Sequence, residues 1–521
     1  MKRGSVTVFL SMIFILMISF ITGILEISSL QISKNMSRLE TDRAIFSVFG
    51  EYQKELMKAY HVFGLEGSYG TGNYREENLI KKMHYYGSAS VEHEIKGIQY
   101  LTDNQGQPFR EQVLAYMEQR YGISLVSDLT GLTAKWKEQE IQGQEMGNRK
   151  STVLGEYQTI KEPPPAETGN GQGEEISEER KAQLAAQEAD RQAAIDTGDR
   201  AFNCINTVEN KGVLALVLPK EMMLSGKAVQ MEKQASVRTL RTGRGEFPMR
   251  QSADGVTETL MFNEYILQQF DCAVKDSGVK TNGSTGNGAS GSSGTSKKTD
   301  VAKQAGKESK TVEPSDGEER SLSYEVEYII AGKNSDRDNL ESVLMQIFLI
   351  RMGLNYKHLM SDPEKKSQAQ AMAATITALL LKPHLIEVFK HLLIFAWAAG
   401  ESAVDIRAML SGRKVALEKS KDTWQLSLSS LLTLGTDSDT NGGGDDKNGL
   451  GYQDYLRILL FIKNRDEVTM RTIDRVEENL IICDKLTFFQ ADQCVTKLEL
   501  NNTARILDQI TYKFPVYFGY S

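Results

Sequence analysis

The apolar run VTVFLSMIFILMISFITGIL starts at Val6, ends at Leu25 and contains no charged side chain. A helix rises about 1.5 Å per residue, so this run is long enough to cross the roughly 30 Å hydrocarbon core of a bilayer. Lys2 and Arg3 precede the run, and Glu26 is the first charge after it. Because basic residues favour the cytoplasmic side, the sequence predicts a single-pass membrane protein with a cytoplasmic N-terminus and a large extracytoplasmic body.

Two other interpretations of this segment stay open. A secretory signal peptide would end at a small-x-small cleavage site, and residues 22–29, TGILEISS, contain no clean site of that kind. A prepilin-type leader would instead be a short basic head that a peptidase removes after Gly4, so that the mature chain would begin with the helix. We take the membrane anchor as the leading interpretation.

Residues 3–10, RGSVTVFL, resemble the N-terminus of TadE/TadG-like minor pseudopilins of the tight-adherence (Flp) pilus system. Those proteins usually carry glutamate five residues after the cleavage glycine, where this chain has Phe9. Four further stretches resemble an uncharacterised family of large membrane-anchored proteins of Gram-positive anaerobes, often encoded beside Tad-type pilus genes. These stretches are residues 60–65, 397–407, 423–427 and 451–456. The resemblance implies that the protein belongs to the cell envelope or to a pilus, and it implies no particular activity.

The charge balance argues against a nucleic-acid partner. The chain carries 61 Lys and Arg against 69 Asp and Glu, which gives a net charge of -8. The basic residues are dispersed among the acidic ones and form no basic footprint. We therefore expect no nucleic-acid binding.

The cysteines leave one question open. Cys204, Cys272, Cys483 and Cys494 are too few and too scattered for a disulfide scaffold, and none forms a C-x-x-C pair. Cys483 and Cys494 are close enough in sequence to bridge across a hairpin in an oxidising exterior. Buried thiols are an equally good interpretation of the same residues.

The helix that begins in the apolar run is expected to continue beyond it. Apolar residues recur at spacings of three, four or seven on one stripe, which predicts a helix that ends before Gly64. The stripe consists of Leu39, Phe46, Phe49, Leu56, Tyr60 and Phe63. A single rod from bilayer to head and a plain anchor followed by a separate surface helix both fit this pattern.

The rest of the chain predicts an α+β head in which helices cover an antiparallel sheet. A strand is expected at residues 91–101, followed by a turn at residues 103–106 and a helix from Pro108. The alternation in residues 323–331 predicts a second strand before another helix. Two strands, 494–500 and 504–514, with a turn at Asn501-Asn502 predict a hairpin. Two buried helices, 371–381 and 385–399, are expected to form the main core.

Low-complexity segments suggest the domain boundaries. A Pro/Gly spacer at residues 163–173 precedes a charged, solvated helix from residue 174 to about 196, and residues 275–320 are expected to be a disordered linker. The predicted organisation is a membrane anchor (1–28), a long helix with a first α+β segment (29–160), a linker with the charged helix (161–200), a second α+β segment (201–274), the disordered linker (275–320) and a C-terminal helical core with a β-hairpin (321–521).

The sequence offers little for catalysis. His384, Glu387 and His391 would share one helix face, but a single helix supplies them, and the polar edge of a buried helix explains them better. Residues 411–414, SGRK, fit a short S-x-x-K pattern without its companion motifs. Trp397 and Trp424 are expected to be core residues. With no P-loop or nucleophile elbow in the sequence, we expect a non-enzymatic protein without a cofactor.

One weak metal candidate stands out in an acidic, Gly-rich loop. Asp437, Asp439 and Asn441 occupy the first, third and fifth positions of a calcium-loop pattern, and Asp445 occupies the ninth. Asn448 stands at the twelfth position, where a bidentate glutamate is expected. A plain acidic linker is the competing interpretation, so no metal site is assigned firmly.

Together these features predict a membrane-anchored, extracytoplasmic, non-enzymatic protein. The resemblance points to a structural or assembly component of a Tad-like pilus, with the lipid bilayer and other envelope or pilus-assembly proteins as partners. The alternative is a single-pass ligand-binding or sensor module of the envelope that is unrelated to pili.

Overall fold

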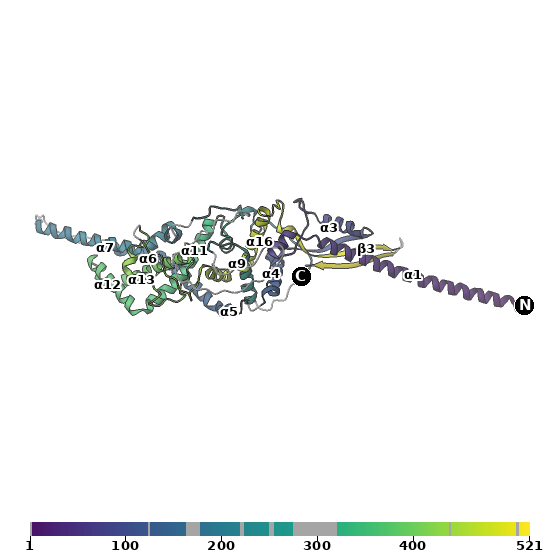
Figure 1. Cartoon of the computed structure of the whole chain (residues 1–521), viewed down its shortest axis with the longest axis horizontal. Coiled ribbons are helices and arrows are strands. Elements are labelled where there is room, and N and C mark those ends of the chain that lie inside the picture. Colours follow the sequence, from purple (N-terminus) through teal and green to yellow (C-terminus); the bar gives the residue numbers. More distant parts are fainter. Residues whose placement is uncertain are drawn as a thin grey trace, which may run out of the picture.

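The computed structural model describes residues 3–122, 125–162, 178–218, 223–248, 255–274, 320–436, 439–506 and 510–520. The molecule is elongated (Figure 1): helix α1 (Arg3–Phe49) emerges at one end, a small sheet follows, and a helical body extends to α7 (Glu178–Lys211) at the other end. The predicted α+β class with an antiparallel sheet is confirmed. The Pro/Gly spacer at 163–173 lies outside the described residues, as does the linker at 275–320 except for Arg320.

Helix α1 is a single rod of 47 residues. It passes unbroken from the apolar run into the head because residues 24–49 contain neither glycine nor proline. The prediction that this helix reaches Phe63 is wrong. Gly50 ends it, and the extended backbone of Gln53, whose N–H donates to the carbonyl of Gly64 at 2.8 Å, separates it from α2 (Lys54–Tyr60).

Strand β3 is the centre of the antiparallel sheet. It spans Cys494–Ile506 and pairs with β2 (Val91–Tyr100) on one side and with β1 (Leu65–Glu66) and β4 (Ile510–Gly519) on the other. The predicted turn at Asn501-Asn502 is wrong, because both residues continue β3. Asn502 is buried there, and its side chain bonds the ring of His93 at 2.6 Å and the carbonyl of Phe514 at 3.2 Å.

The last turns of α1 pack against this sheet. Ala44, Ile45, Val48 and Phe49 are at most 2% exposed and join one apolar cluster with residues of β1, β2 and β3. Tyr520 adds a hydrogen bond of 2.6 Å from its hydroxyl to the carbonyl of Phe49. The sheet therefore holds the rod in a fixed direction relative to the head.

The helical body is an insertion between β2 and β3. The backbone N–H of Leu101 still donates to the carbonyl of Cys494 at 2.9 Å, where the chain leaves and re-enters the sheet. Its helices are α4 (Asp103–Tyr121), α5 (Ser127–Thr130), α6 (Thr133–Lys161), α7, α8 (Leu214–Val217), α9 (Gly255–Gln269), α10 (Glu325–Ala331), α11 (Asp336–Ser361), α12 (Pro363–Leu379), α13 (Ile386–Leu410), α14 (Leu428–Leu431), α15 (Tyr452–Ile462) and α16 (Arg465–Ile482). Outside it, α3 (Glu76–Met83) and the π-helix η1 (His84–Ser88) flank α1 between β1 and β2.

Two local predictions have opposite outcomes. The strand at 91–101 is confirmed as β2, and Asn104, Gln105 and Gly106 form the predicted turn with positive φ values of 49°, 58° and 77°. The strand predicted at residues 323–331 is wrong, because this segment forms α10. The alternation of apolar residues in this segment does not reflect a strand, because residues on every side of α10 are buried, including Glu325 and Glu327.

The predicted core and the charged arm are found largely where expected. The η4 turn (Pro383–Leu385) opens the buried helix α13, whereas α12 buries only one face. Residues 179–190 of α7 are exposed at the far end of the molecule (Figure 1). Burial begins at Ala194, so the second half of α7 belongs to the body.

Candidate functional site

The first half of α1 lies outside the folded head. Its large apolar side chains between Val6 and Leu25 are 42% to 70% exposed, which is unusual for so many of them in water. Among the described residues, α1 is the one helix long and apolar enough to cross a membrane, and a signal sequence would have the same properties.

Beyond Glu26, α1 carries an exposed apolar ridge formed by Ile32, Met36, Leu39 and Phe46. These side chains are 54% to 67% exposed and follow a seven-residue repeat, with Leu25 one repeat earlier. Such spacing keeps side chains on one face of a helix when it packs against another helix. Ala44 and Val48, which pack on the sheet, lie on the opposite side of α1, and Phe46 stands at the edge of the ridge next to β4.

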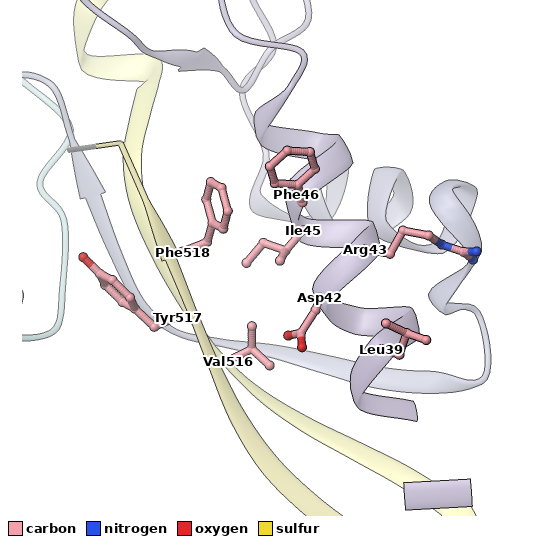
Figure 2. Close-up of a pocket in the computed structure, with 8 residues that line it drawn as sticks. All are labelled: Leu39, Asp42, Arg43, Ile45, Phe46, Val516, Tyr517 and Phe518. Carbon is pink, nitrogen blue, oxygen red and sulfur yellow. The ribbon is translucent and has the colours of Figure 1, made fainter. Parts of the chain in front are cut away.

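A groove of about 430 Å³ runs beside the ridge, between α1 and β4 (Figure 2). Ile45 and Phe46 approach Val516 and Phe518 across it, and Tyr517 points to the other face of the strand. The rings of Phe46 and Phe518 meet edge to face, with centroids 6.0 Å apart. Leu39, Asp42 and Arg43 complete the lining, so the groove has an apolar floor and a charged rim.

A buried ion quartet lies in the helical body, formed by Arg351, Glu401, Asp405 and Lys419. The Lys419 ammonium lies 2.6 Å from Glu401 Oε1 and 2.7 Å from Asp405 Oδ1, and Arg351 Nη2 lies 2.7 Å from Asp405 Oδ2. All four side chains are at most 2% exposed. Two cations face two carboxylates, so the buried cluster is neutral.

The quartet attaches an irregular segment to the core. Arg351 donates to the carbonyls of Ala416 and Leu417 at 2.9 and 3.0 Å. Glu401 accepts from the backbone N–H groups of Gln425 and Leu426. Burial and the neighbouring Asp405 carboxylate raise the pKa of Glu401, and Lys419 opposes that rise. Because each group already has protein partners, the arrangement acts as a structural anchor for residues 416–426.

A second buried polar cluster attaches a long irregular segment, residues 223–248, which we name the strap. The Asp474 carboxylate accepts from the Ser236 backbone N–H at 2.8 Å, from its hydroxyl at 2.6 Å and from the Tyr328 hydroxyl at 2.8 Å. Arg238 bridges Glu477 at 2.6 Å and Asp492 at 2.8 Å. These contacts attach the strap to α16 and to Asp492, and the buried Ala235 adds an apolar contact with the core.

Among the residues that the structure describes, no cation forms an ion pair with Glu327 on α10. Its Oε1 accepts from the Ala273 N–H and the Tyr452 hydroxyl, both at 2.8 Å, while its buried Oε2 has no partner among the described residues. Burial raises the pKa of Glu327 to about 7, although the two hydrogen bonds oppose the rise. The folded state therefore keeps this carboxyl protonated at a pH at which an unfolded chain releases the proton.

We predict that Glu327→Gln flattens the pH dependence of stability. In the wild type, the free energy of unfolding should fall as pH rises from 4.5 towards about 7, by roughly 1.4 kcal/mol per pH unit from this group, because the folded state alone retains the proton. Urea denaturation of the full chain at several pH values measures the slope. Glu418→Gln, at an exposed position, is the control, and equal slopes for wild type and Glu327→Gln would contradict the prediction.

The structure describes only part of the calcium-loop candidate, since Asp437 lies outside the described residues. Asp439 accepts from Arg407 at 2.7 Å and from the backbone N–H groups of Gly435 and Asn441. Asp445 accepts from the backbone N–H of Lys414, 3.0 Å away. Within the described ranges, no group of three or more His, Cys, Asp or Glu converges to hold a metal ion.

The other sequence candidates are dispersed. Glu387 pairs with Lys390, whereas His391 lines a small pocket with Tyr356 and Phe395. The Ser411 hydroxyl donates to the carbonyl of Arg407, one turn earlier in α13.

The predicted core tryptophans meet edge to face, with ring centroids 5.8 Å apart. The indole N–H groups of Trp397 and Trp424 both donate to the carbonyl of Leu426. Cys483 and Cys494 are not joined by a disulfide, and burial raises the pKa of Cys494.

Sequence reasoning missed the ion quartet and the strap. The strap has no periodic pattern, and the quartet joins residues from three separate segments, so no local spacing reveals either one. The sequence feature that could have revealed the quartet is a Lys or Arg within or beside a strongly apolar segment, such as Arg351 in α11.

These features define a protein with a protruding apolar helix, a helix-bearing sheet and a helical body held together by buried ion pairs. The chain belongs to a family of unknown function, DUF5702, which matches residues 192–506. The match begins within α7 and ends with β3, so it leaves α1 to α6, β1, β2 and β4 outside it. Comparisons with curated proteins and with solved structures give no match.

Proposed function

We propose that this chain is a membrane-anchored, extracytoplasmic and non-enzymatic protein that serves as a structural or assembly component of a Tad-like pilus. One observation carries the proposal: α1 continues without a break from the apolar run into the sheet, where Ala44, Ile45, Val48 and Phe49 are buried. Such a rod holds the head at a fixed distance and direction from the bilayer. A flexible tether, which would suit an independent sensor, would leave the distance and direction of the head variable.

Two further observations support the proposal. Residues 3–10 resemble the TadE/TadG-like N-terminus, which connects the anchored rod with pilus assembly. The ion quartet is buried and satisfied by protein partners, which favours a structural role for this concentration of charge. The exposed ridge on α1 supplies a contact surface close to the membrane.

Protease accessibility and crosslinking test the proposal. Protease added to intact protoplasts should digest the body, and a pull-down from crosslinked cells should recover pilus-assembly proteins. A protected body contradicts the topology. Recovery of an exposed, anchored chain without pilus proteins contradicts the pilus role and favours the sensor alternative. Loss of Met1 to Gly4 in the intact mass would support prepilin-type processing, and a full-length mass would support a simple anchor.

We predict that the double substitution Phe14→Arg and Leu16→Arg removes the chain from membranes. Two arginines near the centre of the apolar run add roughly 5–7 kcal/mol to the cost of insertion. Immunoblotting of membrane and soluble fractions measures the shift. The matched control places Gln31→Arg and Asn35→Arg on the exposed helix beyond Glu26, where the chain should stay in the membrane fraction. Retention of the first variant in membranes would show that this run is not the anchor.

A further inference from the structure

We propose that two copies of this chain associate in parallel through the ridge of α1, an inference that rests on the membrane anchoring proposed above. The ridge supplies the first argument. Ile32, Leu39 and Phe46 are separated by seven residues, and Met36 stands four residues after Ile32. This is the pattern of the two core positions of a coiled coil, in which each apolar side chain meets its equivalent on the partner helix.

The membrane anchor supplies the second argument, because it fixes the direction of α1 and the distance of each ridge residue from the bilayer. Measured from Leu25, Ile32 stands about 10 Å, Leu39 about 21 Å and Phe46 about 32 Å along the helix axis. Two copies in one bilayer point the same way and begin at the same level. Each ridge residue of one copy therefore meets the same residue of the other, and confinement to the membrane raises the effective concentration of the two helices.

Charge supplies the third argument. Arg43 occupies a core position of the same repeat, and Asp42 occupies the flanking position beside it. In the part of the chain that the structure describes, neither side chain forms an ion pair, and both line the rim of the groove. In a parallel pair, Arg43 of one copy meets Arg43 of the other, and the Asp42 carboxylates flank these two cations. The one charged core position thus brings its own counter-charge to the interface.

The groove supplies the fourth argument. Phe46 is 67% exposed at its edge, beside an apolar floor formed by Ile45, Val516 and Phe518. Phe46 lies beside this floor (Figure 2). A second helix laid along the ridge covers the floor and places its own Phe46 against it. Both the helix and the sheet of the head therefore contribute to the contact surface.

Disulfide trapping in membranes tests the pairing. In a Cys483→Ser background, Ile32→Cys and Leu39→Cys should form a product of twice the chain mass under mild oxidation. Their direct neighbours, Gln31→Cys and Arg38→Cys, are the matched controls, since adjacent positions point about 100° apart on a helix. We expect the ridge positions to give at least about fivefold more dimer than their neighbours, as expected for a defined helix face.

A second variant separates a specific interface from random collision. Phe46→Glu places like charges opposite each other and should reduce trapping at Ile32→Cys severalfold. Ile141→Glu, at a residue that is 58% exposed on α6 in the helical body, should leave trapping unchanged.

Three outcomes would overturn the self-association. They are equal yields at ridge and neighbouring positions, no dimer, or a conjugate whose mass reveals a different protein. The same samples are fractionated and treated with protease. An anchored, exposed chain without dimer refutes the pairing alone, whereas absence from membranes refutes the proposed function as well.

Discussion

Replacing Asp405 by asparagine is expected to lower the free energy of unfolding of the full chain by about 3–5 kcal/mol. Asp405 bridges both cations of the ion quartet, with Oδ2 on Arg351 and Oδ1 on Lys419. The substitution keeps the shape and removes the charge, so two buried cations would face the single carboxylate of Glu401. Because these side chains are at most 2% exposed, water cannot compensate for the missing charge.

Urea denaturation of the full chain in detergent, followed by tryptophan fluorescence, measures this loss. The control is Lys421→Met, which breaks the exposed pair with Glu364, whose two side chains are 70% and 64% exposed, and should leave the midpoint unchanged. A double variant, Asp405→Asn with Lys419→Met, restores one cation to one carboxylate. It should lose less stability than the sum of the single variants. Additive losses would show that the quartet is not a coupled unit.

Replacing Trp397 by alanine should cost about 3–5 kcal/mol, the usual range for deleting a buried large aromatic side chain. Trp397 is 1% exposed at the centre of α13, and its indole N–H donates to the carbonyl of Leu426 at 2.8 Å. The truncation leaves a cavity against Trp424 and removes a link to the segment that the ion quartet also holds. The expected signature is a lower urea midpoint.

Two further substitutions divide this cost into packing and hydrogen bonding. Trp397→Phe keeps most of the volume, and the Leu426 carbonyl keeps its bond from the Trp424 indole, so we expect a loss of only about 1 kcal/mol. Trp424→Ala, at a half-buried position, should fall between the other two variants. A loss for Trp397→Phe as large as that for Trp397→Ala would show that the hydrogen bond, and not the packing, dominates.

Local patterns predicted those elements whose burial has a simple period. β2 alternates buried and exposed residues along most of its length, and α13 is an apolar run opened by a proline, so both were predictable. Residues 323–331 alternate just as clearly but form α10. The failure has a physical cause: tertiary partners bury residues on every side of α10, and a short segment surrounded in this way carries no reliable period.

The surface of α1 was predictable only in part. The sequence placed Leu39, Phe46 and Phe49 on a single stripe, whereas the structure divides them between two faces. Phe49 is 2% exposed against the sheet, while Leu39 and Phe46 are 64% and 67% exposed on the ridge. Which face is covered depends on β4, which lies more than 450 residues further along the chain. No helical period contains that information.

The position of the helical body between β2 and β3 has a consequence for the order of folding. Tyr100 pairs with Val495 across nearly 400 residues, so the sheet must wait until almost all of the polypeptide has been synthesised. Contacts of such long range are slow to form unless the intervening chain has already become compact and brought its ends together. We therefore expect the helical body to fold first and to bring β2 and β3 together. Destabilising substitutions inside the helical body should then prevent the sheet from forming, although they lie far from α1.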